Sequence, residues 1–231
     1  MRLLSVLHAK LATLKYRLRL WWVARGRDAG YRAYLRAQLD RTLLKRSTGA
    51  ASFSTFLIDA LLGVRCQQRP DAAVLCVGCR TTREIDYFKA NGLDNVIGID
   101  LFSAEPEVRV MDMHHMTFRD NSFGIVYASH SLEHAYDEHK VASEIVRVAR
   151  DGAVVAVEAP VQYETRGADR LDFGDSARLR ELFEPYVRRV LWSDDQPAKS
   201  PTNDAGVAVA RVILVIRKSC DAAEKERNGI R

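Results

Sequence analysis

The chain of 231 residues is long enough for one domain with an appendage, and its 47% hydrophobic content excludes global disorder. It has no apolar run of about 18 residues that would predict a transmembrane span, and no continuous apolar stretch of a signal peptide. Four cysteines are too few for a disulfide scaffold, which favours a reducing cytoplasm. The net charge of +5 is uneven, because residues 1–48 hold twelve Lys and Arg but only Asp28 and Asp40. This distribution indicates a basic appendage rather than a uniformly basic nucleic-acid binder.

The first predicted element is an amphipathic helix from Met1 to about Trp22. Its leucines and its two tryptophans recur at i, i+3, i+4 and i+7 spacing, so they share one face that Lys and Arg flank. One interpretation is a helix that packs on the domain and caps its sheet edge. Another is contact of residues 1–25 with a membrane surface and its anionic headgroups. A mitochondrial presequence would show a similar pattern.

A second basic helical stretch covers residues 29–48 and ends at the break Ser47-Thr48-Gly49. Phe53 to Leu62 then predicts a short apolar helix. We therefore expect a basic helical N-terminal extension over residues 1–48 and a separate domain over residues 49–231.

From Asp71 onward, strand patterns alternate with helix patterns, which predicts an α/β fold with a mostly parallel sheet. Two late strands without an intervening helix predict an antiparallel pair at one edge. The expected helices are Thr82–Asn91, Val141–Val148 and Arg178–Phe183, and the expected strands are Ala73–Val77, Val96–Ile99, Val108–Met111, Ile125–Ala128, Ala153–Val157, Val187–Trp192 and Val207–Ile216.

Ligands of an open parallel sheet bind beyond the carboxyl ends of the strands, so the residues there are candidate site residues. Gly78 would permit a sharp turn and a close approach of a ligand to the backbone. Asp100 would accept hydrogen bonds from both hydroxyls of a ribose, although its spacing from Gly78 also suits a dinucleotide-binding fold. Asp112 would accept from an adenine amino group while Met113 packs on the ring. Turn or cap roles for both acids, and a core role for Met113, stay open.

Three further segments follow in a distinctive succession: Phe118 to Val126, Ser131-Leu132-Glu133-His134, and Glu144 to Gly152. Together with Gly78 and Asp100, they resemble the class I S-adenosylmethionine-dependent methyltransferases, in particular the group that includes the ubiquinone-biosynthesis type. The resemblance covers about Asp71 to Pro160. It implies a Rossmann-like, seven-stranded, mostly parallel sheet with helices on both faces, and S-adenosylmethionine as the cofactor.

The resemblance also implies roles for single residues. Asp100 would bind ribose, Asp112 and Met113 the adenine, and Gly78 and Cys79 the methionine part, while Arg80 would pair with a carboxylate of the cofactor. The glycine-rich loop diverges from the family: Cys76 stands in place of an acid, and Arg80 and Thr82 in place of glycines. The full set of expected cofactor-binding residues is Gly78, Cys79, Arg80, Asp100, Leu101, Asp112, Met113 and Ser129.

A hydroxyl or amine acceptor must lose a proton on methylation, which calls for a general base. His130 follows the fourth strand at the mouth of the expected site and is our candidate, with Glu158 and Tyr163 as secondary ones. A structural role is the alternative for each. The charged segment Tyr163–Asp175 follows the fifth strand, where acceptor-recognition loops belong.

Two patterns that suggest other chemistry are disfavoured. Cys76 and Cys79 form C-x-x-C, but the first lies inside an apolar strand rather than on an exposed loop. His130 and His134 are four residues apart, but His134 belongs to the recognised triplet, where it is usually structural. We therefore expect no metal site.

The expected function is methyl transfer from S-adenosylmethionine to a small polar acceptor at O or N. The alternative is a non-catalytic protein of the same fold that binds a nucleoside ligand or a protein partner. A nicotinamide-dependent oxidoreductase is disfavoured because no G-x-G-x-x-G is present. Nucleic acid is a less favoured partner, and we expect a cytoplasmic protein, with attachment to a membrane surface as the alternative.

Overall fold

The structure is a computed structural model that describes residues 14, 16–18, 20–21, 23–48, 55–64, 72–103, 105–165, 167–203 and 206–218. The first half of the expected N-terminal helix lies outside these residues, as do Trp22, Gly49 and Phe53. Most of the described positions between 14 and 24 are helical. None of the described helices is long and apolar enough to cross a membrane.

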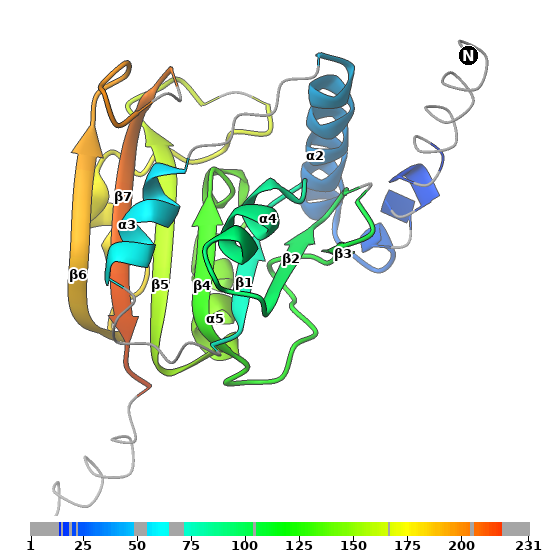
Figure 1. The fold of residues 1–231 in the computed structure, drawn as a ribbon. Coiled ribbons are helices and arrows are strands. Elements are labelled where there is room, and N and C mark those ends of the chain that lie inside the picture. Colours follow the sequence, from blue (N-terminus) through cyan, green and yellow to red (C-terminus); the bar gives the residue numbers. More distant parts are fainter. Residues whose placement is uncertain are drawn as a thin grey trace, which may run out of the picture.

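Seven strands form one sheet in the order β3-β2-β1-β4-β5-β7-β6. The strands β1 to β5 are parallel, and β7 is antiparallel to both of its neighbours, β5 and β6 (Figure 1). This confirms the expected fold class and the antiparallel pair at the end of the chain. The strands are β1 (Val74–Val77), β2 (Val96–Asp100), β3 (Val108–Val110), β4 (Phe123–Ser129), β5 (Ala149–Val161), β6 (Val187–Gln196) and β7 (Ala208–Ile216).

Helices cover both faces of the sheet, as expected. Side chains of α3 (Phe56–Val64) and α4 (Arg83–Ala90) share one apolar cluster on one face. The other face packs against α5 (Glu138–Val148) and α6 (Ser176–Glu181), and the short 3-10 helix η2 (Leu132–His134) follows β4. The helix α2 (Ala29–Thr48) stands apart from both layers, beside the carboxyl ends of the strands (Figure 1).

The central strands are apolar because both of their faces are covered. All four residues of β1 are buried, and so are the last nine of β5. Runs of this kind are typical of parallel strands between two helical layers. The central strands therefore form the core, and β2 and β4 end in the polar residues Asp100 and Ser129.

The strand β5 is longer than its sequence pattern predicted. We expected a turn at Asp151-Gly152 and a strand that begins at Ala153, but the strand starts at Ala149. The extra residues are accommodated by a shift in register, since Phe123 pairs with Ala149 whereas Ile125 pairs with Val154. Gly152 has a φ of 73°, so the glycine permits an irregularity inside the strand rather than its start.

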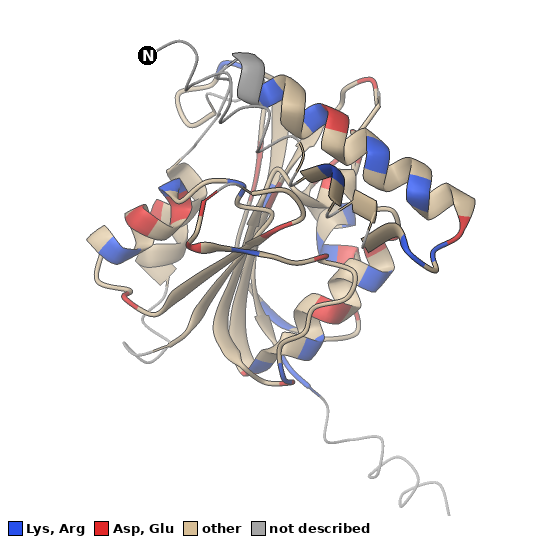
Figure 2. Cartoon of the chain, turned by 90° about the vertical axis from the view of Figure 1, so that its right-hand side faces the viewer, with Lys and Arg blue, Asp and Glu red and all other residues tan. Residues whose placement is uncertain are grey.

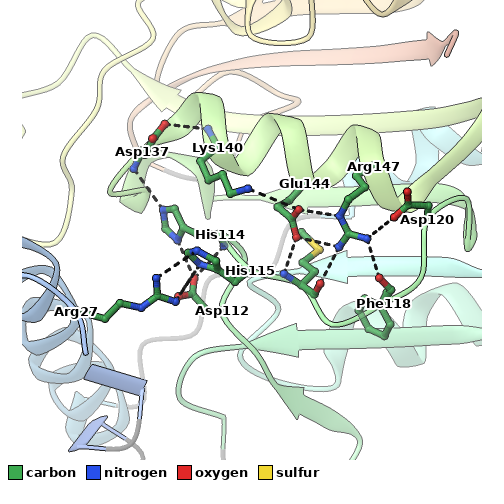
Figure 3. A network of polar contacts seen from close by, with 11 residues as sticks. Arg27, Asp112, His114, His115, Phe118, Asp120, Asp137, Lys140, Glu144 and Arg147 are labelled. Carbon is green, nitrogen blue, oxygen red and sulfur yellow. Dashed lines mark hydrogen bonds and ion pairs between the residues drawn. The ribbon is translucent and has the colours of Figure 1, made fainter. Parts of the chain in front are cut away.

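A clamp of hydrogen bonds fixes the connection from β3 to β4 against α5 (Figure 3). Arg147 donates to the carbonyl oxygens of Met116 and Phe118, at 2.7 and 2.8 Å. The same guanidinium pairs with Glu144 at 2.8 Å and with Asp120 at 2.7 Å. Glu144 is buried and also accepts from the backbone N–H of Met116 at 2.7 Å. The clamp thus places the connection that carries Asp112 at the end of β3.

We expect Arg147→Ala to lower the free energy of unfolding by about 2–4 kcal/mol, because it leaves the buried carboxylate of Glu144 without its cation. Denaturant unfolding followed by circular dichroism measures this change. Lys140→Ala on the same helix is the control, since its exposed Nζ lies 4.0 Å from Glu144 and contributes less than about 1 kcal/mol. Equal losses in the two variants would contradict the clamp.

Candidate functional site

A small cavity lies at the carboxyl ends of β1, β2 and β4, beneath α2. Its volume is about 50 Å³. A water molecule needs roughly 10–15 Å³ of such volume, whereas sites for small-molecule ligands span about 300–1,000 Å³. The cavity therefore has room for a few waters, and side chains of α2 take up part of the space above the strand ends. It is lined by Tyr34, Gln38, Thr42, Gly78, Arg80, Ile99, Asp100, Leu101, Met111, Met113, His130, Ser131 and His134.

The middle of α2 is tied to η2 and to the loop after β5. Gln38 donates from Nε2 to the carbonyl oxygens of His134 and Ala168, at 3.3 and 3.2 Å. Arg41 forms an ion pair with Asp169, which lies in the segment that we expected to recognise the acceptor. The helix thus bridges the mouth of the cavity and reaches that loop.

The start of α2 is tied to Asp112. The hydroxyl of Tyr31 donates to one oxygen of this buried carboxylate. The other oxygen accepts from the backbone N–H and the Nδ1 of His114, at 2.9 and 2.8 Å. His114 in turn receives the backbone N–H of Tyr136 at Nε2, at 3.0 Å, so its proton must be on Nδ1. Figure 3 shows Asp112 and His114 beside the start of α2.

The hydrogen bonds around Asp112 keep it ionised. Burial alone would raise its pKa, but the donors His114 and Tyr31 outweigh burial and lower the pKa below the ordinary value. The residue that we expected to bind adenine therefore already has donors on both oxygens. It lines a neighbouring groove, which shares Leu101 and Met111 with the cavity, rather than the cavity itself.

Several polar atoms around the cavity are buried without a hydrogen-bond partner among the described residues. Arg80 and Tyr34 contribute a donor Nε and a hydroxyl. Ser131 and Glu133 contribute a hydroxyl and one carboxylate oxygen, and three of these four residues line the cavity. An unsatisfied buried polar group costs about 1–3 kcal/mol. Their concentration here indicates a place for a polar ligand that brings both acceptors and donors.

The turn after β1 needs glycine for two reasons. Gly78 has a φ of 77°, a backbone conformation that residues with a side chain avoid. A Cβ at this position would also overlap with the Cβ of Ser131. The close approach at Gly78 is therefore one between two chain segments, and Ser131 takes the place next to the glycine.

Asp100 lies at the end of β2 and lines the cavity, as expected for a ribose-binding acid. Its carboxylate accepts from the backbone N–H of Phe102 at 2.7 Å and of Arg80 at 3.2 Å. These bonds hold the carboxylate at the cavity, where each oxygen has a further lone pair.

Three expected cofactor residues line no part of the cavity. The thiol of Cys79 is buried against Gly98 in the core, and burial raises its pKa. Cys76 is fully buried as well, so neither thiol of the C-x-x-C is on an exposed loop. Ser129 donates to Glu158 at 2.9 Å, and Asp112 is held as described above. Gly78, Arg80, Asp100, Leu101 and Met113 do line it.

His130 forms a dyad with Glu158 at the mouth of the cavity. Its Nε2 lies 3.1 Å from the Glu158 carboxylate, and its backbone N–H donates to the Glu158 carbonyl at 3.0 Å. Its φ of 49° is rare for a residue with a side chain, so the surroundings hold the backbone of His130 in this conformation. Behind the dyad, the buried Arg211 pairs with the second oxygen of Glu158 and with Asp194 at 3.4 Å.

The dyad changes the acidity of both partners. Burial would raise the pKa of Glu158, but the hydrogen bond and charge of His130, together with Arg211, lower it to about 2. Burial would lower the pKa of His130, but the bond to Glu158 and the charges of Glu133 and Glu158 raise it above the ordinary value. A neutral His130 that donates from Nε2 to Glu158 keeps its lone pair on Nδ1, which is the arrangement of a general base.

Sequence reasoning missed the side chains of α2 and Arg211. Tyr31, Tyr34, Gln38 and Thr42 recur at helical spacing as a polar stripe inside a basic stretch, which was the available signal. Arg211 is a single charge inside the apolar run Val207–Ile216, and such a charge needs a buried partner.

Glu133, His134 and Asp169 bring three potential metal-ligand atoms within 4.8 Å of one another. Arg41 contacts the same Asp169, so a guanidinium already supplies the positive charge that a metal would bring. We therefore interpret the arrangement as an ion-pair network.

Comparisons with known proteins show what this sequence and this fold are similar to. Residues 75–157 match the model of a methyltransferase domain family. The fold is similar to that of the Burkholderia thailandensis 1,6-didemethyltoxoflavin-N1-methyltransferase, solved with 1,6-didemethyltoxoflavin and S-adenosylhomocysteine bound. The TM-score is 0.61 at 16% identity, over 81% of this chain and 89% of that one. A comparison with curated proteins found no match to the sequence.

Two other solved structures show how varied proteins of this fold are. The [4+2]-cyclase SpnF has a TM-score of 0.60 at 14% identity, over 81% of this chain and 97% of that one. A chain from the complex between the Haloferax volcanii Trm112 methyltransferase activator and the putative methyltransferase has a TM-score of 0.56 at 16% identity, over 79% and 97%. At these identities the likeness establishes the fold, and the chemistry must come from the site.

Tyr31→Phe should loosen α2, because it removes a donor from the buried carboxylate of Asp112 at a cost of about 1–2 kcal/mol. Hydrogen exchange of the α2 amides should then speed up by about 5–30-fold. Arg32→Ala, an exposed change on the same helix, is the control. The pKa of Asp112 is lowered in the folded chain, so this stabilisation is present above about pH 4 and is lost as the pH falls through the folded pKa. Unchanged hydrogen exchange of the α2 amides in Tyr31→Phe would contradict a role of Tyr31 in holding α2.

Proposed function

The chain contains a class I methyltransferase domain, and from this premise we propose that it binds S-adenosylmethionine and methylates a small polar acceptor at O or N. The observation that carries the proposal is the set of buried polar atoms around the cavity at the ends of β1 and β2 that have no hydrogen-bond partner within the described part of the chain. Ligands of open parallel sheets bind at this edge.

The unpartnered groups match the chemistry of the cofactor. A methionine moiety carries a carboxylate and an ammonium, and the buried Nε of Arg80 and the Glu133 carboxylate are complementary to these two charges. Asp100 would bind the ribose hydroxyls, while Leu101 and Met113 offer apolar surface for the adenine. The donor set therefore fits the cofactor, although the glycine-rich loop differs from the family pattern.

Space for the cofactor requires a shift of α2. The cavity of about 50 Å³ is too small for an adenosyl group, and the side chains of Tyr34 and Gln38 lie in its wall. We infer that α2 moves outward when the cofactor binds. If the adenine amino group then donates to Asp112, it replaces the hydroxyl of Tyr31.

When bound, S-adenosylmethionine supplies an electrophilic methyl group. The chain must orient the acceptor for in-line displacement and remove its proton. His130 is the residue that we assign to proton removal, through Nδ1, and Glu158 positions the ring and stabilises its protonated form. Arg211 and Ser129 hold Glu158 in turn. The raised pKa of His130 means that its base form increases as the pH rises through that value.

A second candidate is a non-catalytic protein that binds a nucleoside ligand or a partner protein. The small cavity favours this reading. The similarity to the [4+2]-cyclase SpnF means that this fold is not limited to proteins named as methyltransferases.

Titration calorimetry with S-adenosylmethionine and with S-adenosylhomocysteine tests cofactor binding. We expect dissociation constants in the micromolar range, and a loss of at least about tenfold in Asp100→Asn, which weakens the acceptors for the ribose hydroxyls. Asp94→Asn, an exposed change near the start of β2, is the matched control. Absence of binding by the folded wild-type chain would favour the non-catalytic alternative.

The dyad is tested by the pKa of His130, which needs no knowledge of the acceptor. In Glu158→Gln the hydrogen-bonded charge is lost and burial remains, so the pKa of His130 should fall below its wild-type value. Nuclear magnetic resonance titration of the histidine ring signals measures it, with the exposed His139 as internal control.

Glu158→Gln also leaves the buried Arg211 without its carboxylate, which would destabilise the fold. The double variant Glu158→Gln/Arg211→Met removes both charges and serves if the single variant does not fold. A pKa of His130 that stays unchanged in a folded variant contradicts the dyad.

A further inference from the structure

A surface of exposed apolar and basic side chains lies on the outer side of the N-terminal helices. Leu14, Leu18 and Trp21 expose 54%, 60% and 65% of their surface. Most large apolar side chains in the described chain are far less exposed, so three on one helical segment require an explanation. We call them, together with the arginines described next, the basic-apolar surface.

The exposed leucines are not the inner face of a packed helix. Positions 14, 18 and 21 follow i, i+4 and i+7 spacing and share one side. On the other side, Tyr16 is buried against Phe102, with ring centroids 6.1 Å apart. The segment therefore already satisfies its contact with the domain through Tyr16 and its neighbours. The second apolar side, with Leu14, Leu18 and Trp21, belongs to neither of the apolar clusters that the described residues form around this segment.

Four arginines lie beside this apolar side, next to Trp21. Arg17, Arg25, Arg32 and Arg36 are all exposed, and they line one groove of about 380 Å³ together with Trp21. The Arg25 guanidinium lies 5.7 Å from the centroid of the Trp21 ring. The described residues that line the groove include no acidic one. Figure 2 shows the basic positions along α2.

We propose that the basic-apolar surface binds the face of a membrane with anionic headgroups. Leucine side chains and a tryptophan ring would enter the boundary between headgroups and acyl chains, and the four guanidinium groups would contact lipid phosphates. The combination favours a membrane over nucleic acid, which has no place for Leu14 and Leu18. It also disfavours a second copy of the chain, because a twofold contact would bring the arginines of the two copies together.

The position of α2 gives this surface a defined relation to the cavity. Arg32 and Arg36 are exposed and fall on the side of α2 opposite Tyr34 and Gln38, which line the cavity. A membrane bound at the basic-apolar surface would therefore contact the helix that covers the strand ends. The proposal goes beyond methyl transfer and does not depend on it.

Sedimentation of the full chain with vesicles tests the proposal. We expect binding to vesicles of equal parts phosphatidylcholine and phosphatidylglycerol, and at least about tenfold weaker binding to pure phosphatidylcholine or in 0.5 M salt. The triple variant Leu14→Ser/Leu18→Ser/Trp21→Ser should weaken binding at least about tenfold. Arg32→Glu/Arg36→Glu should weaken it by at least about 25-fold, since each arginine contributes about a factor of five near an anionic surface.

Matched controls lie on the exposed part of β6, at the other edge of the sheet from α2 and the N-terminal segment. Tyr186→Ser/Val190→Ser removes exposed apolar side chains, and Arg188→Glu/Arg189→Glu reverses two exposed arginines. Both should leave vesicle binding within about twofold of the wild type. Circular dichroism and melting curves establish that every variant is folded.

Several results would overturn the proposal. They are no binding of the wild type to anionic vesicles, equal losses in the β6 controls, and unchanged binding in the triple variant. Binding of a random RNA that is tighter than vesicle binding and insensitive to the triple variant would assign the arginines to nucleic acid. A wild-type dimer in light scattering that the triple variant converts to monomer would assign the apolar side to a second copy.

Discussion

The hydrogen bonds that Asp112 accepts from Tyr31 and His114 join the N-terminal helix α2 to the end of the parallel sheet. Asp112 lies at the end of β3, where the fold offers polar groups to ligands, and it already accepts three hydrogen bonds from within the chain. A buried carboxylate with donors on both oxygens is stable only while those donors stay. Together with the bonds of Gln38 and the ion pair of Arg41, this contact holds α2 over the cavity. Whatever binds at the strand ends must offer Asp112 an equal set of donors or leave Tyr31 in place.

The fold could be predicted from the sequence because its signals are local. Continuous apolar runs such as Val74–Val77 indicate strands that are buried on both faces, and Gly78 marks the turn that follows. The boundaries were less accurate. The pair Asp151-Gly152 has the composition of a turn, yet pairing with β4 extends the strand through it, and only a register shift reveals how. Tertiary pairing overrode local turn preference there.

The site could be predicted in part, since topology places residues after strands but not their partners. Asp100 and His130 line the cavity, where the strand order puts them. The same logic placed Asp112 in the site, but the sequence did not show that Tyr31, 81 positions earlier, would occupy its carboxylate. Contacts between an extension and a domain depend on docking, which has no local signature. The fixed ring of His130 likewise depends on Arg211, which reaches Glu158 from a strand 53 positions later.

Two features of the cavity have opposite implications for the arrangement in which α2 covers the strand ends. Its volume leaves room for a few waters only, whereas its walls hold the Nε of Arg80 and the hydroxyls of Tyr34 and Ser131, which have no hydrogen-bond partner among the described residues. If the cavity served only to pack against α2, we would expect apolar walls, because each buried polar group without a hydrogen bond costs about 1–3 kcal/mol. The contacts of Tyr31, Gln38 and Arg41 offset that cost while α2 is docked. A ligand that pairs with the unsatisfied groups would recover it, and this difference in free energy favours an outward shift of the helix on binding.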